Sequence, residues 1–416
     1  IEACPTGIDI PNFIRMIATG NLKGSATEIL TENVFGGACA RVCPTEVLCE
    51  EACVRNGSEH KPVRIGALQR HATDWLFERD IQPFARAAAS GKRIAVVGGG
   101  PAGLSCAHRL AMFGHAVTVF EAKPRFGGLN EYGIAAYKLP DNFAQREVDF
   151  ILSLGGITAR CDQALGRDIT LTGLRRDYAA VFLGIGLAGV NVLQLEGEEM
   201  AGVEDAVGYI ARLRQAADLS TLPVGRKVVV IGGGNTAIDI AVQSKRLGAE
   251  DVTIVYRRGA GQMGATPHEQ EFAQVNGVKI KHWARPVRLI GWPIDGGRRA
   301  LRAPGNSGKR ALREVEFEYT QLDEAGRLAG TNDHFSLLAD TLFKAIGQVF
   351  LPDPLKAGST EPLDIRNGRI VVNDDRQTSL PGVFAGGDCT AGLDLTVRGV
   401  EDGKVAAQAI DRYLRT

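Results

Sequence analysis

Two glycine-rich turns in this chain carry residues whose types and spacing could do chemistry. The first is Gly98-Gly99-Gly100-Pro101-Ala102-Gly103, which follows an apolar run at residues 94–97. The second is Gly232-Gly233-Gly234-Asn235-Thr236-Ala237, which follows an apolar run at residues 228–231. Glycines in such a turn allow the backbone to approach a pyrophosphate at the N-terminus of the next helix. We therefore predict that each turn binds the phosphates of a dinucleotide.

The strands that follow the two turns end in opposite charges. The strand after the first turn, residues 116–120, ends at Glu121, and the strand after the second, residues 252–256, ends at Arg257 and Arg258. A carboxylate accepts hydrogen bonds from a free ribose diol, whereas arginines accommodate a ribose 2′-phosphate. The pattern favours FAD at the first site and NADP(H) at the second. NAD(H) stays possible there, because adjacent arginines at a strand end are often only solvated charge.

The cysteines indicate a third site. Five of the eight lie within the first 53 residues: Cys4, Cys39, Cys43, Cys49 and Cys53. Clustered cysteines in a cytosolic type of redox enzyme favour a metal over disulfides, and Cys-Pro after a cysteine run is typical of [4Fe–4S] ferredoxins. Zinc is the main alternative, but it usually needs a Cys-x2-Cys pair or a suitably spaced histidine, and neither occurs here. Reduced structural thiols are the other alternative.

The composition limits the class of protein and the kinds of partner that are compatible with this chain. The chain has 416 residues, 44% of them hydrophobic and 23% charged, which is ordinary for a globular protein of two or three domains. Lys plus Arg and Asp plus Glu both total 48, so we expect neither nucleic acid nor an anionic membrane as a partner. No apolar stretch approaches the length that spans a bilayer, and we expect a cytoplasmic protein. The chain starts at Ile1 rather than at a methionine, so we expect residues upstream of it.

The order of elements predicts an α/β fold with three domains. Residues 1–85 show helical patterns between cysteine loops, which predicts a small α-helical iron–sulfur domain. From Arg93 onward short β-rich runs alternate with helices, as in a doubly wound parallel sheet. We expect an FAD-binding domain at residues 86–190 and 350–416, interrupted by an NAD(P)H-binding domain at residues 191–349, both Rossmann-like. The Gly-, Arg- and Pro-rich residues 292–313 are interpreted as a surface excursion of the second domain.

This arrangement resembles the electron-input module shared by dihydropyrimidine dehydrogenase and the small subunit of glutamate synthase. Three motifs look closer to the pyrimidine branch: Ile65-Gly66-Ala67-Leu68-Gln69, Thr396-Val397-Arg398-Gly399-Val400-Glu401-Asp402-Gly403-Lys404, and Cys39-Ala40-Arg41-Val42-Cys43-Pro44-Thr45-Glu46. In that branch the glutamine is a cluster ligand, whereas the glutamate synthase branch tends to have an acidic residue there. A basic residue that grips the NADPH phosphate in the mammalian branch falls at about Gly264 here, which weakens the preference for NADPH.

The resemblance also implies site residues. Cys4, Cys43, Cys49 and Gln69 would bind one [4Fe–4S] cluster, and Cys53 would supply the last ligand of a second cluster whose other cysteines lie upstream. The resemblance and the two turns together predict cofactor contacts at the following residues: Val42, Gly98, Gly100, Pro101, Ala102, Gly103, Glu121, Gly128, Leu129, Lys138, Gly232, Gly234, Asn235, Thr236, Arg257, Arg258, Ala345, Gly347, Gly387, Asp388, Thr396 and Val397.

The implied activity needs no catalytic side chain. The resemblance implies an NAD(P)H-oxidising subunit of dihydropyrimidine dehydrogenase, which passes electrons through FAD and [4Fe–4S] clusters to a partner FMN subunit that reduces uracil and thymine. Nicotinamide gives a hydride to flavin, and flavin releases electrons singly, so the protein supplies binding and electrostatics. Two alternatives are the small subunit of NADPH-dependent glutamate synthase and a non-catalytic flavin and iron–sulfur redox sensor or scaffold.

Overall fold

The computed structural model describes residues 1–293, 310–357 and 361–415, and the chain in it divides into two compact units. The first unit comprises Ile1–Glu131, Tyr137–Gly189 and Val349–Thr416, and the second comprises Tyr132–Ala136 and Val190–Gln348. The second unit is thus an insertion within the first. The division into three domains at residues 85, 190 and 350 stays a prediction.

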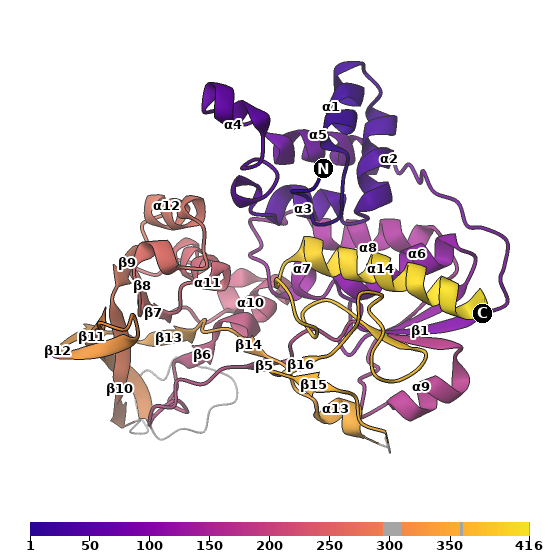
Figure 1. The fold of residues 1–416 in the computed structure, drawn as a ribbon. Coiled ribbons are helices and arrows are strands. Elements are labelled where there is room, and N and C mark those ends of the chain that lie inside the picture. Colours follow the sequence, from indigo (N-terminus) through magenta and orange to yellow (C-terminus); the bar gives the residue numbers. More distant parts are fainter. Residues whose placement is uncertain (294–309, 358–360, 416) are drawn as a thin grey trace. The chain divides into compact units, whose positions relative to one another are not determined.

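Every element of secondary structure within residues 1–85 is a helix. They form α1 (Ile10–Ala18), α2 (Leu22–Glu32), α3 (Gly36–Val42), the 3-10 helix η1 (Thr45–Val47), α4 (Val54–Glu59) and α5 (Ile65–Phe77) (Figure 1). Short polar side chains cap the first two helices, since Asp9 accepts from the Asn12 amide and Asn21 from the Gly24 amide. All of these residues are described and none is in a strand, which agrees with the absence of a strand pattern in the sequence.

A parallel sheet of five strands forms the centre of the first unit. Its order is β17-β4-β1-β2-β3, with bounds β1 (Arg93–Val97), β2 (Ala116–Phe120), β3 (Ile157–Arg160), β4 (Ala180–Leu183) and β17 (Val383–Ala385). The middle strands are buried apolar runs, as expected where helices cover both faces of a parallel sheet. Because β17 pairs with β4, the last segment of the chain completes this sheet.

Helices cover this sheet. They are α6 (Pro101–Met112), α7 (Leu129–Tyr132), α8 (Phe143–Ser153), α9 (Leu171–Asp177) and α14 (Thr396–Arg415). The C-terminal α14, drawn in yellow in Figure 1, packs along α6 although almost 300 residues separate the two in the sequence. Smaller elements of the same unit are α13 (Asp353–Lys356), β15 (Ile365–Arg366) and β16 (Arg369–Ile370).

The second unit contains another parallel sheet of five strands. Its order is β6-β13-β7-β8-β9, with bounds β6 (Val203–Asp205), β7 (Lys227–Ile231), β8 (Asp251–Tyr256), β9 (Lys279–His282) and β13 (Thr341–Lys344). Its helices are α10 (Ala206–Gln215), η2 (Leu219–Thr221), α11 (Asn235–Arg246), η3 (Ala260–Gln262) and α12 (Pro267–Val275). Two β-α-β units with parallel sheets confirm the predicted α/β fold class. The short strands β5 (Gly189–Val190) and β14 (Gln348–Val349) pair where the chain passes between the units.

The second unit also contains an antiparallel sheet that the sequence analysis missed. It consists of β10 (Ala284–Pro293), β11 (Arg310–Leu322) and β12 (Leu328–Leu338) in that order. Residues 292–313, interpreted from the sequence as a surface excursion with no secondary structure assigned, belong to this sheet at both ends, because Trp292 and Pro293 end β10 and Arg310 begins β11. The remainder, residues 294–309, lies outside the described residues. Charged residues alternate along β11, so its strand character depends on one buried face that includes Val315 and Phe317.

No helix among the described residues is long and apolar enough to cross a lipid bilayer.

Candidate functional site

The first glycine turn connects β1 to α6 through positions that only glycine fits. Gly98 has a φ of +103°, and a Cβ placed on it would lie 2.2 Å from the Gly184 carbonyl oxygen. A Cβ on Gly103 would lie 1.9 Å from the Gly98 oxygen. These close backbone approaches bring β1, β4 and the start of α6 together, so the amides at the N-terminus of α6 face the carboxyl end of the sheet. Pro101 begins α6, a position where a missing N–H costs no helical hydrogen bond.

Glu121 lies directly beside this turn. Its Oε2 accepts a hydrogen bond from the Gly99 amide at 2.7 Å, and its Oε1 accepts one from the Lys123 amide at 2.9 Å. The carboxylate at the end of β2 is therefore fixed next to the turn that would hold a pyrophosphate. This is the arrangement in which a carboxylate can accept hydrogen bonds from the adjacent adenosine ribose.

Residues from the C-terminal segment complete the surroundings of the turn. A Cβ on Gly387 would lie 2.9 Å from the Ala102 Cβ, and one on Gly399 would lie 3.7 Å from the same atom. A Cβ on Gly403 would lie only 2.1 Å from the Ala102 carbonyl oxygen. The structure thus brings the predicted residues Ala102 and Gly387 together. Gly399 and Gly403, which the sequence analysis did not assign to the site, give the backbone of α14 close access to the first turn of α6.

Gly128 brings a third segment to the same place. It has a φ of +54°, and a Cβ on it would lie 2.7 Å from the Gly100 Cα. Leu129 begins the short helix α7, and Lys138 follows in the half-buried chain after it. The predicted positions of Gly100 and Gly128 are therefore in direct contact. The assignment of Leu129 and Lys138 to the flavin side stays a prediction.

Asn130 is a candidate that sequence reasoning missed. Its Oδ1 accepts a hydrogen bond from the Thr396 hydroxyl at 3.0 Å, so it links α7 to the start of α14. The side chain is 1% exposed, and its Nδ2 has no hydrogen-bond partner among the described residues. An unsatisfied buried amide donor indicates a missing acceptor. It fits a bound isoalloxazine, whose carbonyl oxygens and ring nitrogens are acceptors, and no sequence pattern signals it.

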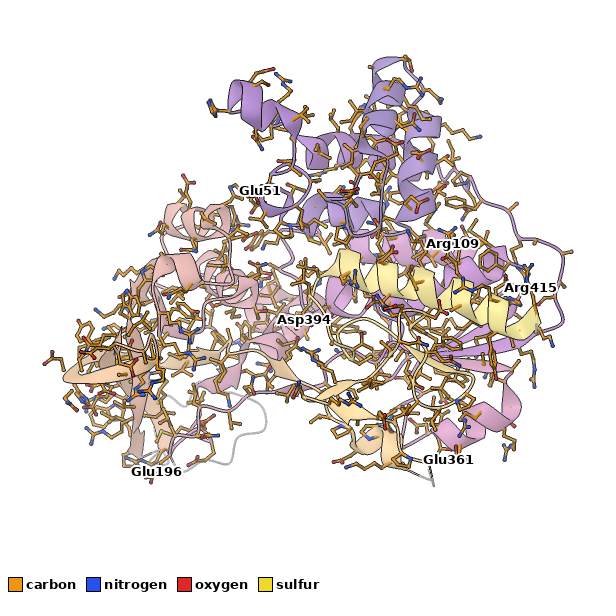
Figure 2. The ribbon with its side chains drawn as sticks, viewed as in Figure 1. Glu51, Arg109, Glu196, Glu361, Asp394 and Arg415 are labelled. Atoms are coloured by element: carbon orange, nitrogen blue, oxygen red, sulfur yellow. The ribbon has the colours of Figure 1, made fainter. Side chains whose placement is uncertain are left out.

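Asp388 and Val397 flank the same region. The pKa of the Asp388 carboxyl is raised to about 6, chiefly by burial and also by the neighbouring carboxylates of Asp394 and Asp402, against a lowering by Arg369. Asp394 is labelled in Figure 2, where it precedes α14. Val397 is buried in the first turn of α14, whose N-terminal amides carry partial positive charge. This end of α14 can therefore stabilise negative charge that develops on a bound ring.

The second glycine turn, in the second unit, connects β7 to α11. Gly232 has a φ of +146°, and a Cβ on it would lie 2.2 Å from the Ala345 carbonyl oxygen, so these two predicted residues are in contact. Gly234 has open space around it and precedes Asn235, the first residue of α11. The Asn235 Oδ1 is buried without a hydrogen-bond partner in the described part of the chain. The open turn and this orphaned oxygen fit a bound dinucleotide at the helix N-terminus. Thr236 follows as the second residue of α11.

Arg257 and Arg258 follow β8 beside this turn. Arg257 is exposed and Arg258 half-buried, and neither guanidinium makes a hydrogen bond or ion pair with another described residue. The loop after them folds back on the turn, since the Ala265 amide donates to the Gly233 carbonyl at 2.9 Å. Both guanidinium groups are thus available to an anionic ligand. Gly347, with a φ of +93°, lies three residues after the end of β13, the strand that pairs with β7.

The predicted cluster ligands lie within residues 1–85 of the first unit. The Cys4 Sγ lies 3.2 Å from the Thr6 hydroxyl oxygen. Burial, together with the charges of Glu50 and Cys4, raises the pKa of the Cys49 thiol to about 11, so Cys4 and Cys49 lie close enough to interact. Hydrogen bonding with Cys43 raises the pKa of the buried Cys39 well above its usual value, and burial adds to this.

The remaining predicted ligands are more dispersed. Gln69 is 7% exposed, and its Nε2 donates to the Gly36 carbonyl at 2.7 Å, which fixes the amide between α5 and α3. The Cys53 Sγ accepts from the Val63 amide at 3.5 Å, and Val42, half-buried, ends α3. Among residues 1–293, 310–357 and 361–415, no three His, Cys, Asp or Glu side chains gather as a metal site. The donor set of cysteine thiols and a buried amide nevertheless fits iron–sulfur chemistry, which uses thiolate ligands.

Sequence families match both parts of the chain. Residues 92–403 match the family described as pyridine nucleotide-disulphide oxidoreductase, and residues 1–81 match dihydropyrimidine dehydrogenase domain II, 4Fe-4S cluster. The NAD-dependent dihydropyrimidine dehydrogenase subunit PreT of Salmonella typhimurium is 33% identical over 99% of this chain and 90% of its own length. The glutamate synthase [NADPH] small chain of Escherichia coli is 32% identical over 99% of this chain and 87% of its own length.

Solved structures show the same fold at lower identity. FprA of Mycobacterium tuberculosis in complex with NADPH has a TM-score of 0.60 at 19% identity, over 78% of this chain and 85% of its own. Thioredoxin reductase of T. acidophilum has a TM-score of 0.58 at 20% identity, over 78% of this chain and 100% of its own. FAD, NAD(P)H and [4Fe–4S] are the cofactors of this chain, which is an NAD(P)H-dependent oxidoreductase of the electron-transfer type. The chain belongs to the pyridine nucleotide-disulphide oxidoreductase family and carries the 4Fe-4S domain of dihydropyrimidine dehydrogenase at its N-terminus.

Proposed function

We propose that this chain is the NAD(P)H-oxidising subunit of a hetero-oligomeric dihydropyrimidine dehydrogenase. It would pass electrons through FAD and [4Fe–4S] clusters to a partner subunit with FMN, where uracil and thymine are reduced to 5,6-dihydropyrimidines. The relative PreT is named as a subunit of a dihydropyrimidine dehydrogenase, which supports both the reaction and the existence of a partner.

The observation that carries this proposal is the placement of Gln69. Its side chain is buried, faces α3 and is held by a hydrogen bond to the Gly36 carbonyl. A buried glutamine amide is costly unless it has a polar partner. By resemblance, the glutamate synthase branch has an acidic residue at this position. Gln69 therefore favours the pyrimidine branch, with a ligand role alongside Cys4, Cys43 and Cys49.

The chain's own residues would bind and orient the cofactors. Residues 98–103 with Gly128 and Glu121 would hold the FAD pyrophosphate and ribose, and Asp388 the ribityl-phosphate region. Thr396, Val397 and Asn130 would face the isoalloxazine. Residues 232–236, Ala345 and Gly347 would hold the nicotinamide dinucleotide, with Arg257 and Arg258 at a 2′-phosphate. When bound, the flavin supplies the conversion of a two-electron hydride donor into single-electron steps.

Anaerobic mixing with NADPH or NADH tests the input half of the proposal. The purified holoprotein is expected to lose its flavin absorbance on addition of at least one of the two, and NADPH is expected to act at lower concentration. A flavin that neither nucleotide bleaches would support the non-catalytic redox sensor or scaffold instead, because a sensor needs no hydride donor.

The output half is tested on the native complex. We expect it to contain an FMN-bearing subunit and to consume NAD(P)H when uracil or thymine is added. The glutamate synthase small chain is nearly as similar to this chain as PreT, so that reaction is the specific alternative. Consumption of NAD(P)H with 2-oxoglutarate plus glutamine, but not with uracil, would reject the proposal and support the glutamate synthase alternative.

A further inference from the structure

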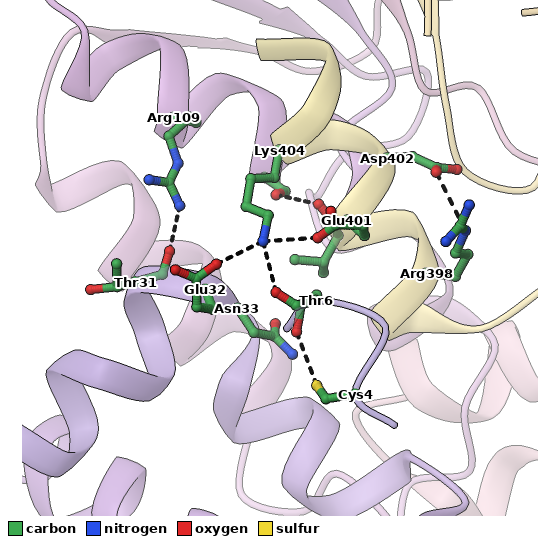
Figure 3. Close-up of polar contacts among 12 residues, drawn as sticks. Cys4, Thr6, Thr31, Glu32, Asn33, Arg109, Arg398, Glu401, Asp402 and Lys404 are labelled. Atoms are coloured by element: carbon green, nitrogen blue, oxygen red, sulfur yellow. Dashed lines mark hydrogen bonds and ion pairs between the residues drawn. The ribbon is translucent and has the colours of Figure 1, made fainter. Parts of the chain in front are cut away.

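The ammonium group of Lys404 is buried between α14 and the N-terminal helices. The residue is 8% exposed, and its Nζ donates to the Thr6 carbonyl oxygen at 2.7 Å and to Glu32 Oε2 at 2.8 Å. It also forms an ion pair with Glu401 Oε2 at 2.9 Å (Figure 3). A buried charge is retained only when it is paired and hydrogen-bonded. Lys404 therefore holds the loop around Thr6 in one position relative to α14.

The Thr6 hydroxyl in turn lies against a predicted cluster ligand. Thr6 is 1% exposed, and its Oγ1 is 3.2 Å from Cys4 Sγ. A cysteine that ligates iron is a thiolate and has no proton, so in that state the hydroxyl must be the donor. A continuous path thus runs from the Lys404 ammonium through the Thr6 backbone and hydroxyl to the Cys4 sulfur (Figure 3).

The charges around Lys404 nearly balance one another. Arg109, labelled in Figures 2 and 3, donates to the Thr31 carbonyl oxygen. Burial lowers its pKa, while Glu32 and Glu401 raise it. Two cations, Lys404 and Arg109, and two carboxylates, Glu32 and Glu401, therefore share this region. The group that acts on the sulfur most directly is the oriented Thr6 hydroxyl.

The helix that carries Lys404 also reaches the proposed flavin site. Thr396 begins α14 and bonds Asn130, and Lys404 lies eight residues later, a rise of about 12 Å along the helix. One rigid element therefore contacts the flavin-binding segments at its N-terminus and the Cys4 loop two turns further on. Both contacts lie within the first unit.

We infer that Thr6, held by Lys404, is a positioning residue that raises the reduction potential of the cluster bound by Cys4. This inference rests on the proposed function, since it takes Cys4 as a cluster ligand. An O–H donor to a ligand sulfur stabilises the more electron-rich reduced cluster, and hydrogen bonds to sulfur are among the factors that set such potentials. One electron enters the cluster in this step, and no bond is made or broken.

Redox titration of the holoprotein, followed by electron paramagnetic resonance, tests this inference. Thr6→Val keeps the shape of the side chain and removes the hydroxyl, whereas Thr6→Ser keeps the hydroxyl. We expect Thr6→Val to lower the midpoint potential of one cluster by ~59 mV, which corresponds to a tenfold change in the one-electron equilibrium constant. Thr6→Ser should titrate like the wild type. Thr27→Val is a matched control, since that hydroxyl bonds the Lys23 carbonyl of its own helix.

A midpoint that is the same in Thr6→Val, Thr6→Ser and wild type would overturn the inference. If the Thr6→Val protein fails to bind iron, the Lys404→Gln variant replaces it in the test. This substitution frees the Thr6 loop and should shift the same midpoint potential downward. An unchanged midpoint potential in Lys404→Gln would overturn the inference. In either case a flavin that NAD(P)H still bleaches leaves the proposed function standing. A wild-type preparation without acid-labile sulfide would overturn both.

Discussion

At the scale of single residues, we predict that the choice between the two nicotinamide cofactors depends on Arg257. Its guanidinium is exposed at the end of β8 and makes no ion pair with another described residue. Arg257→Ala should remove a charge-assisted hydrogen bond to the 2′-phosphate, worth about 1.5–3 kcal/mol. The KM for NADPH is then expected to rise by about tenfold to a hundredfold, while the KM for NADH changes little. Stopped-flow flavin reduction with each nucleotide measures both values.

Arg327→Ala is a suitable control for this experiment. Arg327 is an exposed arginine of the second unit that pairs with Asp323 in the turn before β12, away from the glycine turn. Its removal should leave both KM values unchanged. Equal losses for NADPH and NADH in the Arg257 variant would show that the arginine does not read the phosphate.

Glu147 is a buried acid that makes the stability of the first unit depend on pH. The pKa of its carboxyl is raised to about 8, because the effect of burial exceeds the opposing effects of hydrogen bonds from the Ala38 and Gly37 amides and of the charge of Arg41. Between pH 6.5 and 8 the unfolded chain has lost this proton and the folded chain still holds it. Stability should therefore fall as pH rises, by up to about 1.4 kcal/mol per pH unit. Glu147→Gln should flatten this slope, as measured by denaturant unfolding.

Between pH 6.5 and 8, the effect of Glu147 on stability can be separated from the effects of other groups with shifted pKa values. The pKa of Asp388 is raised to about 6 and that of His108 lowered to about 3, both chiefly by burial, so their proton differences lie mostly below this window, and the remainder from His108 makes stability rise with pH rather than fall. Glu59→Gln is the control, because its hydrogen bond with Arg55 lowers the Glu59 pKa and keeps it ionised in both states. A wild-type slope retained in Glu147→Gln would assign the pH dependence to another group.

At the scale of elements, the packing of α14 on α6 depends on a helical glycine. A Cβ on Gly403 would lie 2.1 Å from the Ala102 carbonyl and 2.9 Å from the Cys106 amide nitrogen. Both are backbone atoms and cannot move aside independently. Gly403→Ala is therefore expected to destabilise the first unit by about 1–3 kcal/mol despite the better helix propensity of alanine. It should also lower the flavin content if α14 lines the FAD site as proposed.

Gly57→Ala provides the matched comparison. Gly57 also lies in a helix, α4, but a Cβ there meets nothing within 4 Å. This substitution should leave the free energy of unfolding unchanged or raise it by at most about 1 kcal/mol, so the melting temperature should not fall. If both variants unfold at the wild-type temperature and retain flavin, α14 does not depend on this close approach.

For the whole molecule, we predict that FAD binding requires both ends of the first unit. The glycine turn lies near residue 100, whereas β17 and α14 lie after residue 382. A chain that ends at Asp394 keeps the turn, Glu121 and Gly128 but loses the buried apolar residues of α14, among them Val397, Val400 and Ile410. We expect it to purify without flavin, which absorbance at the isoalloxazine bands would show.

A chain that ends at Tyr413 is the control for this truncation. It loses only the last residues of α14, of which Arg415 is exposed, and should keep a full complement of flavin. A chain ending at Asp394 that still binds one FAD would mean that the turn and β2 suffice, and that α14 contributes only stability.

The local elements could be predicted from the sequence. Apolar runs before each glycine turn predicted β1 and β7, and the alternation of strands and helices predicted two parallel sheets. These signals are local, because burial imposes a period of 3.6 residues on a helix and near-continuous apolar runs on parallel strands. The antiparallel sheet β10–β12 escaped prediction because β11 is rich in charged residues, and only its partners show which face is buried.

The sequence by itself determined the cofactor chemistry, because the glycine turns, the charged residues that follow them and the cysteines are local features that can be recognised without the tertiary structure. Only the tertiary structure decided which distant residues meet: Gly403 at Ala102, Thr396 at Asn130, and Lys404 at Thr6. Each of these pairs is separated by more than 250 positions. Contacts over such separations are set by how whole elements pack, and close packing has no periodic signature along the chain.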